Sequence, residues 1–159
     1  MVRLRALVAL PLTFVLAFAT VDLAVPASAS AASVRVKATA LPAIAKLAAK
    51  QVGRRYVEGG TTPKRGFDCS GLVTYTYKKA AKIRLPHSAQ QQFKKARKIS
   101  ARKARPGDLV FFHDGSGHVY HVGIYAGQHR MYAAATVKDG VRFQSIWSRA
   151  ITYGTFRHG

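Results

Sequence analysis

Cys69 is the residue best suited to chemistry, because it is the only cysteine of the chain and cannot form a disulfide within it. It stands between Asp68 and Ser70 in "RGFDCSGLVTYTY", directly before a run with helical character. The first turn of a helix offers unpaired backbone N–H groups and a partial positive charge, which favour a thiolate and can later hold an oxyanion. A buried structural cysteine is the alternative, but the flanking residues are polar or small. The position therefore predicts a reactive nucleophile.

A nucleophilic thiol needs a base, and the segment "HVYHVGIYAG" offers one in His121. Strand alternation places Val122 and Ile124 on one face and His121 on the other, away from its apolar neighbours. A cysteine at a helix start facing a histidine on a sheet is the papain-type arrangement for nucleophilic catalysis. A lone histidine in a strand is more often simply packed or exposed. His121 is the predicted base, with His113 and His118 as its competitors.

Three helical segments are expected in the first part of the chain. "LPAIAKLAAKQVG", from Leu41, has apolar residues at helical spacing and ends near Gly53. "CSGLVTYTYKKAAK" begins at Cys69, after a loop rich in Gly, Thr and Pro. "LPHSAQQQFKKARK" is a turn followed by a short helix, with Ser88 as its N-cap and Gln91 three residues on.

The pattern changes after "RPGD". The segments "DLVFFHD", "HVYHVGIYAG", "RMYAAAT", "VRFQSIW" and "ITYGTF" are short, β-branched or aromatic, and separated by turn residues. Helices first and strands second predict the α+β class. We expect N-terminal helices packed on a small antiparallel sheet of about five strands.

Residues 1–31 are expected to form a cleaved signal peptide. Arg3 and Arg5 supply its positive start, its apolar stretch is too short to span a bilayer comfortably, and "ASASA" supplies small residues for cleavage. An uncleaved anchor is the alternative, but polar and proline residues interrupt the apolar run. Residues 32–40 are then a short mature leader, and residues 41–159 form a single domain.

The charge of the chain is extreme, with 26 Lys and Arg against 6 Asp and Glu, or a formal +20. Such a protein is drawn to polyanions. For an exported protein, anionic wall polymers or acidic membrane surfaces are better candidates than nucleic acid. The positive residues are scattered along the sequence, so a simply solvated surface is the alternative.

Three motifs together identify a family resemblance. "YVEGGTTPKRGFDCSGLV", "RPGDLVFF" and "HVGIYAG" resemble, in order and spacing, the NlpC/P60 family of bacterial cell-wall cysteine peptidases. The resemblance covers residues 41–156 and implies a circularly permuted papain-like fold that needs no metal or other cofactor. It implies cleavage of peptidoglycan stem peptides, most often between D-glutamate, through its γ-carboxyl, and diaminopimelate. By this resemblance Cys69 is the nucleophile and His121 the general base and acid.

The resemblance also predicts substrate-binding residues. Tyr56 matches the tyrosine that lines the family's active site, and Asp68 and Ser70 match residues that hold the free amino end or polar backbone of the substrate. A carboxylate and a phenol suit an ammonium group, although Asp68 is alternatively a plain helix cap. Ser88 and Gln92 fall near the family's substrate-side turn.

The sequence departs from the family at two positions. The family usually has a third polar residue, most often histidine, twelve positions after the base, but this slot is Ala133 in "MYAA". Alanine cannot orient the imidazole of His121. A water, a backbone carbonyl or another side chain replaces the third residue, or the enzyme is a slow dyad, or it is inactive. Restoring histidine at this slot is expected to raise turnover modestly. Glu58 also stands where the family usually has an aromatic residue.

These features predict a secreted, wall-associated, monomeric cysteine peptidase acting on peptidoglycan stem peptides. Its charge adds anionic wall polymers as partners, and nucleic acid is not expected. The alternative is a catalytically weak or inactive cationic wall-binding module on the same fold. A membrane-active cationic protein is a third reading, which leaves the cysteine and histidine unexplained.

Overall fold

A computed structural model describes residues 35–157 of the chain. The expected signal peptide and the first residues of the expected leader lie outside this range. Within it, no helix is both long and apolar enough to cross a membrane. Val36 is fully buried, and its N–H donates to the Phe156 carbonyl at 2.7 Å. The leader segment therefore contributes a side chain to the core before the first α-helix begins.

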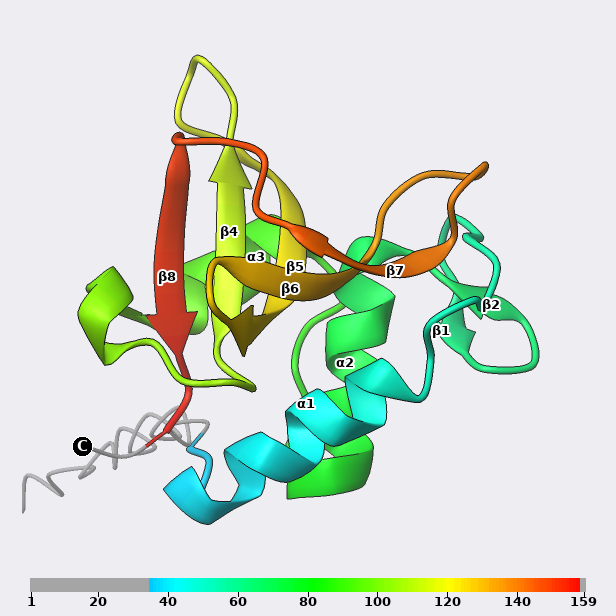
Figure 1. Ribbon diagram of the computed structural model, residues 1–159, viewed down its shortest axis with the longest axis horizontal. Helices are drawn as coiled ribbons and strands as arrows, with labels where there is room; N and C mark the ends of the chain where they lie inside the picture. The colour runs from blue at the N-terminus through cyan, green and yellow to red at the C-terminus, as the bar shows by residue number, and fades with distance from the viewer. Residues whose placement is uncertain (1–34, 158–159) are drawn as a thin grey trace, which may run out of the picture. The chain divides into compact units, whose positions relative to one another are not determined.

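The centre of the fold is an antiparallel sheet of six strands in the order β3-β8-β4-β5-β6-β7 (Figure 1). The five strands expected from the sequence are all present, and the α+β class is confirmed. A sixth strand, β3, joins the edge of the sheet by pairing with β8. The strands are β3 (Arg97–Ile99), β4 (Leu109–His113), β5 (Val119–Gly127), β6 (Arg130–Ala134), β7 (Val141–Ser145) and β8 (Ile151–Thr155).

The helices begin where the sequence predicts. Helix α1 (Leu41–Ala49) has a proline in its first turn, which suits the fixed φ of proline, and α2 (Cys69–Ala81) is capped by Asp68. Helix α3 (Ala89–Lys95) is capped by Ser88, whose hydroxyl accepts from the Gln91 N–H at 3.3 Å. The remaining short elements are the 3₁₀ turns η1 (Ala38–Ala40) and η2 (Ala101–Lys103) and the hairpin strands β1 (Thr61–Thr62) and β2 (Gly66–Phe67).

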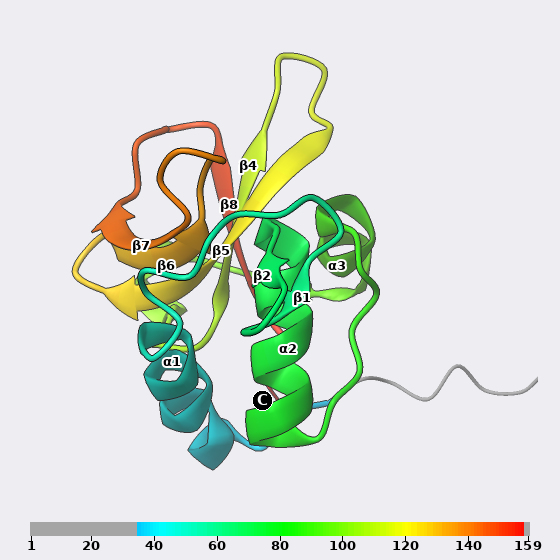
Figure 2. The same cartoon turned by 90° about the vertical axis from the view of Figure 1, so that its right-hand side faces the viewer.

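The core has two parts, one on each face of the sheet. Helix α2 lies between α1 and α3 on one face (Figure 2), and the helices bury the β4 residues Leu109 and Phe111 there. On the other face, Val110 and Phe112 pack with apolar residues of β6 and of the segment after β7. Alternate residues of β4 therefore serve different cores, which fixes the register of the central strands.

Candidate active site

Cys69 is the first residue of α2, and Asp68 fixes the turn that presents it. The Asp68 carboxylate accepts the Gly71 N–H at 2.7 Å and the Gly59 N–H at 2.8 Å. A Cβ on Gly71 would overlap the carbonyl of Gly60, so only glycine lets the helix start lie this close to the preceding turn. Asp68 therefore does cap the helix, which is the alternative role considered for it above.

The sulfur of Cys69 lies between α2 and β5. Backbone N–H groups of Val122, on β5, and of Ser70 hydrogen-bond to it and lower the pKa of the thiol. Burial acts in the opposite direction and is the larger effect, so the pKa of Cys69 rises to about 11. The helix start thus does not by itself make a resting thiolate, because desolvation of the charged form outweighs it. The thiol needs a base to remove its proton.

His121 is the side chain best placed to remove the thiol proton. It is adjacent in sequence to Val122, whose N–H contacts the sulfur, and it lines a cavity of about 500 Å³ together with Cys69. Its ring is buried against Phe112 and Trp147, with both ring centroids 5.4 Å away. Burial lowers the pKa of His121 to about 4, so at neutral pH the imidazole is uncharged and can accept the thiol proton.

A β-bulge in β5 affects the direction of the His121 side chain. Phe112 pairs with His121, but the next residue of β4, His113, pairs with Val119, so Tyr120 is an additional residue in β5. Such a bulge bends the strand and redirects a side chain, often beside an active site. His121 and Tyr120 line the same cavity as a result.

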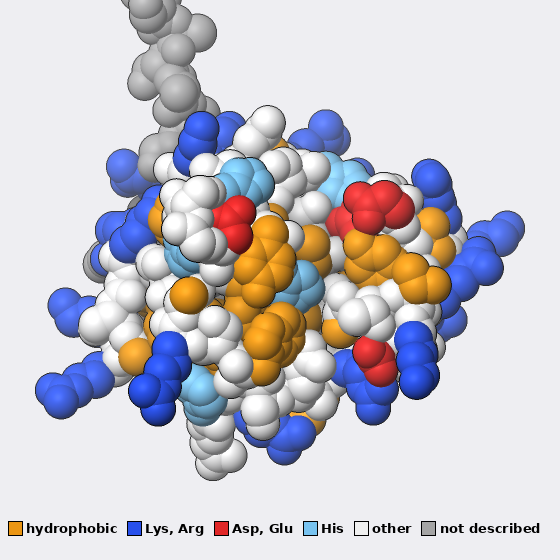
Figure 3. Space-filling view, turned by 90° about the horizontal axis from the view of Figure 1, so that it is seen from above, with side chains coloured by type: hydrophobic (Ala, Val, Ile, Leu, Met, Phe, Trp, Pro, Cys, Tyr) orange, Lys and Arg blue, Asp and Glu red, His pale blue; other side chains and the backbone are white. Residues whose placement is uncertain are grey.

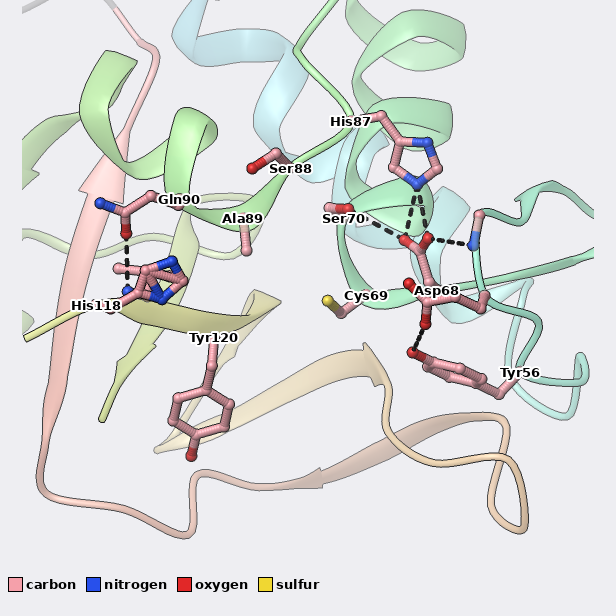
Figure 4. A pocket seen from close by; sticks show the side chains of 13 residues that line it. Tyr56, Asp68, Cys69, Ser70, His87, Ser88, Ala89, Gln90, His118 and Tyr120 are labelled. Carbon is pink, nitrogen blue, oxygen red and sulfur yellow. Dashed lines mark hydrogen bonds and ion pairs between the residues drawn. The ribbon is translucent and has the colours of Figure 1, made fainter. Parts of the chain in front are cut away.

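The competing histidines are placed differently. The Nε2 atom of His113 lies 2.9 Å from Thr152 Oγ1, and its ring packs edge-on against Phe93, so its environment is structural. His118 does not line the cavity of His121 but a neighbouring cavity of about 610 Å³, where Figure 4 shows it next to Gln90 and across the opening from the thiol. Neither histidine adjoins the residue that contacts the sulfur.

Two cavities meet at Cys69, and we call them together the Cys69 groove. The first, of about 610 Å³, is lined by residues from the start of α2, the turn before α3 and the start of β5. The second, of about 500 Å³, is the one lined by His121. Tyr56, Cys69 and Tyr120 line both. An extended peptide lying in the groove would therefore pass the sulfur with substrate on either side.

All four predicted substrate-binding residues, Tyr56, Asp68, Ser70 and Ser88, line the first cavity (Figure 4). Tyr56 donates its hydroxyl proton to Glu58 at 2.8 Å, and burial together with this carboxylate raises its pKa. The phenol therefore stays protonated and positions the Glu58 carboxylate in the cavity. Glu58, which departs from the family pattern, thus lies in the groove itself.

The turn before α3 contributes a residue that the sequence analysis missed. His87 Nε2 lies 2.8 Å and 2.9 Å from the two oxygens of Asp68, and the ring lines the first cavity. Gln92, predicted to lie on the substrate side, is instead fully buried. Its amide donates to the Ser70 carbonyl at 3.1 Å and the Pro86 carbonyl at 2.7 Å, so it ties this turn to α2.

The groove is acidic although the chain is strongly basic. Glu58, Asp68 and Asp139 line it, and no lysine or arginine of residues 35–157 does. Figure 3 shows the same separation on one face of the molecule, where apolar, acidic and histidine side chains gather inside a rim of lysine and arginine. Such a lining favours a substrate with a free ammonium group.

Ala133 shows why the family's third position is not filled from β6. Its side chain is fully buried and packs with Phe112, Met131 and Tyr153 on the face of the sheet opposite the helices. Nearby, a Cβ on Gly123 would lie only 2.5 Å from Sδ of Met131, so that sulfur fills the space over the glycine. The slot is closely packed rather than open.

Ala133→His is therefore expected to destabilise the protein, in contrast to the modest gain in turnover that the sequence alone predicts. Inserting a large side chain into a packed core costs about 1–3 kcal/mol in the free energy of unfolding. Denaturant unfolding measures this cost, and Ala133→Leu is the control for size without polarity. An Ala133→His protein with unchanged stability and higher turnover would show that the slot has room for a third residue.

Comparison with known proteins agrees with this arrangement. The sequence profile of the NlpC/P60 family matches residues 53–158. The chain is 43% identical over 99 residues to the gamma-DL-glutamyl hydrolase of Bacillus subtilis (strain 168), covering 62% of this chain and 24% of that protein. It is 47% identical over 108 residues to the bifunctional muramidase/DL-endopeptidase CwlT of the same organism, covering 66% and 32%. Murein DD-endopeptidase MepH of Escherichia coli (strain K12) is 37% identical over 107 residues, covering 63% and 40%.

Solved structures share the fold. The NlpC/p60 domain of the peptidoglycan hydrolase SagA superposes with a TM-score of 0.64 at 32% identity, covering 72% of this chain and 96% of that one. A Staphylococcus aureus protein of the NLP/P60 family gives a TM-score of 0.67 at 33% identity, covering 82% and 45%. The chain spans only 24% to 40% of the length of the three relatives above. The profile match covers well over half of the chain, and the chain belongs to the NlpC/P60 family.

Proposed function

We propose that this protein is a peptidoglycan endopeptidase that hydrolyses stem-peptide amide bonds with Cys69 as nucleophile and His121 as general base and acid. The observation that carries the proposal is the position of the Cys69 sulfur at the junction of two cavities, one of which is lined by a neutral, buried imidazole. Family membership supports the reaction class, since the relatives include hydrolases and endopeptidases.

The reaction follows from the two neutral groups. His121 takes the thiol proton as the sulfur of Cys69 attacks the carbonyl carbon, and N–H groups at the start of α2 stabilise the oxyanion. The imidazolium then gives its proton to the leaving amine, and a thioester remains on the sulfur. Water, deprotonated by His121, attacks the thioester, releases the carboxylic acid and restores the thiol.

The acidic lining supports a substrate class within peptidoglycan. A stem peptide with a free amino end brings an ammonium group that Glu58 and Asp68 can bind in the first cavity. We propose the bond between γ-D-glutamate and the diamino acid, as the resemblance implies. Two of the relatives are named a gamma-DL-glutamyl hydrolase and a DL-endopeptidase, whereas a third is a DD-endopeptidase.

Alkylation of the thiol separates this function from the alternative of a wall-binding module. Cys69 is the only cysteine, so iodoacetamide modifies a single site. The proposal predicts that alkylated protein no longer lyses purified wall but is still pulled down by it. Undiminished lysis after complete alkylation would refute the thiol mechanism, and an absence of lysis before alkylation would favour the binding module.

We further propose that the protein is exported and held at the wall by charge, which the predicted signal peptide and the +20 charge support. Positive side chains concentrate at the β3–β8 edge of the sheet, around a depression of about 400 Å³. The guanidinium of Arg157 is fixed there by donating to the Lys103 carbonyl at 2.5 Å. The lining residues are Arg97, Arg102, Lys103, Arg105 and Arg157.

Retention on intact wall is expected to fall steeply with salt. Exposed charges are screened beyond about 10 Å at 0.1 M and about 3 Å at 1 M ionic strength, so most bound protein should be released at the higher value. The Arg102→Gln/Lys103→Gln variant should be released at lower salt than Lys94→Gln/Lys95→Gln, which removes the same charge from α3. Sedimentation with wall across a salt series measures this. Binding that ignores salt would contradict retention by charge.

A further inference from the structure

Two buried nitrogen atoms line the second cavity of the Cys69 groove without a hydrogen-bond partner. They are Nε2 of His121 and Nε2 of Gln144, and neither has a partner within the described residues 35–157. A buried polar atom left unpaired costs about 1–3 kcal/mol, so two on side chains of one cavity need an explanation. The hydrogen-bonding chemistry of the imidazole of His121 and the amide of Gln144 supplies that explanation.

The sheet places Gln144 on the side of β6 that faces His121. Gln144 pairs with Met131 across β6 and β7, and Met131 pairs with Tyr125 on β5. Met131 and Ala133 pack on the face opposite the helices, and alternate residues of a strand share a face. Because Ala133 carries only a methyl group, the longer Gln144 side chain extends over β6 to the cavity that His121 lines.

Two other polar side chains of this cavity, Asp139 and Thr136, are hydrogen-bonded to each other. Asp139 accepts from Thr136 Oγ1 and from Arg142, each at 2.7 Å. The Gln144 amide makes no such bond among the described residues, so no contact there fixes which end of the amide faces the cavity. Turning the amide by half a revolution exchanges a buried donor for a buried acceptor, which is what a protonated Nε2 requires.

We propose that Gln144 is the positioning residue of this enzyme, and that its side-chain oxygen accepts the N–H of His121 Nε2. This bond holds the imidazole in the Nε2–H tautomer and leaves Nδ1 to take the proton of Cys69. Gln144 therefore takes the role of the family's third residue. It lies on β7, the strand next to β6, where the family's usual position is Ala133. The inference rests on the proposed function for its meaning in catalysis, but the tautomer is a property of the resting protein.

The test compares Gln144→Leu, which has similar size and no acceptor, with Gln144→Glu, which keeps an acceptor. Gln91→Leu, on the exposed side of α3, is the matched control. Imidazole ¹⁵N chemical shifts report the tautomer of His121, and hydrolysis of soluble muropeptides reports kcat and KM. We expect Gln144→Leu to lose the Nε2–H tautomer and about 10–100-fold in kcat with little change in KM, as part of the 10²–10⁴-fold that acid–base catalysis contributes.

Gln144→Glu should retain the tautomer and most of the turnover, and Gln91→Leu should match the unmodified protein. An unchanged His121 tautomer in folded Gln144→Leu would overturn the proposal. If Gln144→Leu does not fold, loss of the Nε2–H tautomer in Gln144→Glu would overturn it instead. Should the unmodified protein hydrolyse nothing, the proposed function fails while the tautomer measurement still decides the role of Gln144.

Discussion

The Cys69→Ala protein is expected to fold normally and to release no stem-peptide fragments from peptidoglycan. Removing the nucleophile leaves no atom to form the thioester, and loss of a catalytic nucleophile costs on the order of 10⁶-fold in kcat. The fold should survive because the turn at Cys69 is fixed by Asp68 and Gly71, not by the sulfur. Muropeptide release followed by chromatography, with thermal unfolding alongside, measures both parts.

Cys69→Ser is the matched control for the chemistry of the side chain. A hydroxyl is smaller and far harder to deprotonate than a thiol, so this variant should be nearly as inactive as Cys69→Ala. Hydrolysis by Cys69→Ala at close to the unmodified rate would show that the groove uses another nucleophile. Loss of folding in both variants would show that the thiol is structural.

His121→Ala is expected to lose almost all activity and also to slow alkylation of Cys69 at neutral pH. Burial raises the pKa of the thiol to about 11, so few thiolates form unless a neighbouring base accepts the proton. Burial keeps the imidazole of His121 uncharged at pH 7, so the ring does not generate a resting thiolate but can take the proton as the sulfur attacks the reagent. The rate of iodoacetamide labelling, followed by mass spectrometry, measures this effect without any substrate.

The competing histidines supply the controls for this prediction. His113→Ala removes a ring bound to Thr152, and His118→Ala removes a ring across the first cavity from the thiol. Neither should change the labelling rate of Cys69 appreciably. If one of them slows labelling while His121→Ala does not, the base has been assigned to the wrong histidine.

Most of the scaffold follows from local signals in the sequence. The Asp68 and Ser88 caps fix two helix starts, and the five strands expected from their β-branched and aromatic residues are all present. The edge strand β3 is a basic, mostly exposed segment that pairs with β8, so its formation depends on a contact distant in sequence. The two-residue strands β1 and β2 are too short to leave a period-2 pattern.

The site was predictable where it depends on residue type and not where it depends on packing. Strand alternation placed His121 opposite Val122, but the bulge at Tyr120 leaves no mark in the sequence. The rise in the pKa of Cys69 comes from burial by distant segments, so the helix start alone predicts the wrong direction. His87 and Gln144 enter the groove through tertiary contacts, and only the turn sequence around His87 offered any signal.

The most direct test of the central claim is the identification of products after digestion of purified peptidoglycan. Soluble fragments from the unmodified and Cys69→Ala proteins are separated and sequenced by mass spectrometry. Our account predicts fragments that end in D-glutamate and fragments that begin with the diamino acid of the stem, from the unmodified protein alone. Fragments cut only in the glycan chain, or the same peptides from Cys69→Ala, would contradict it.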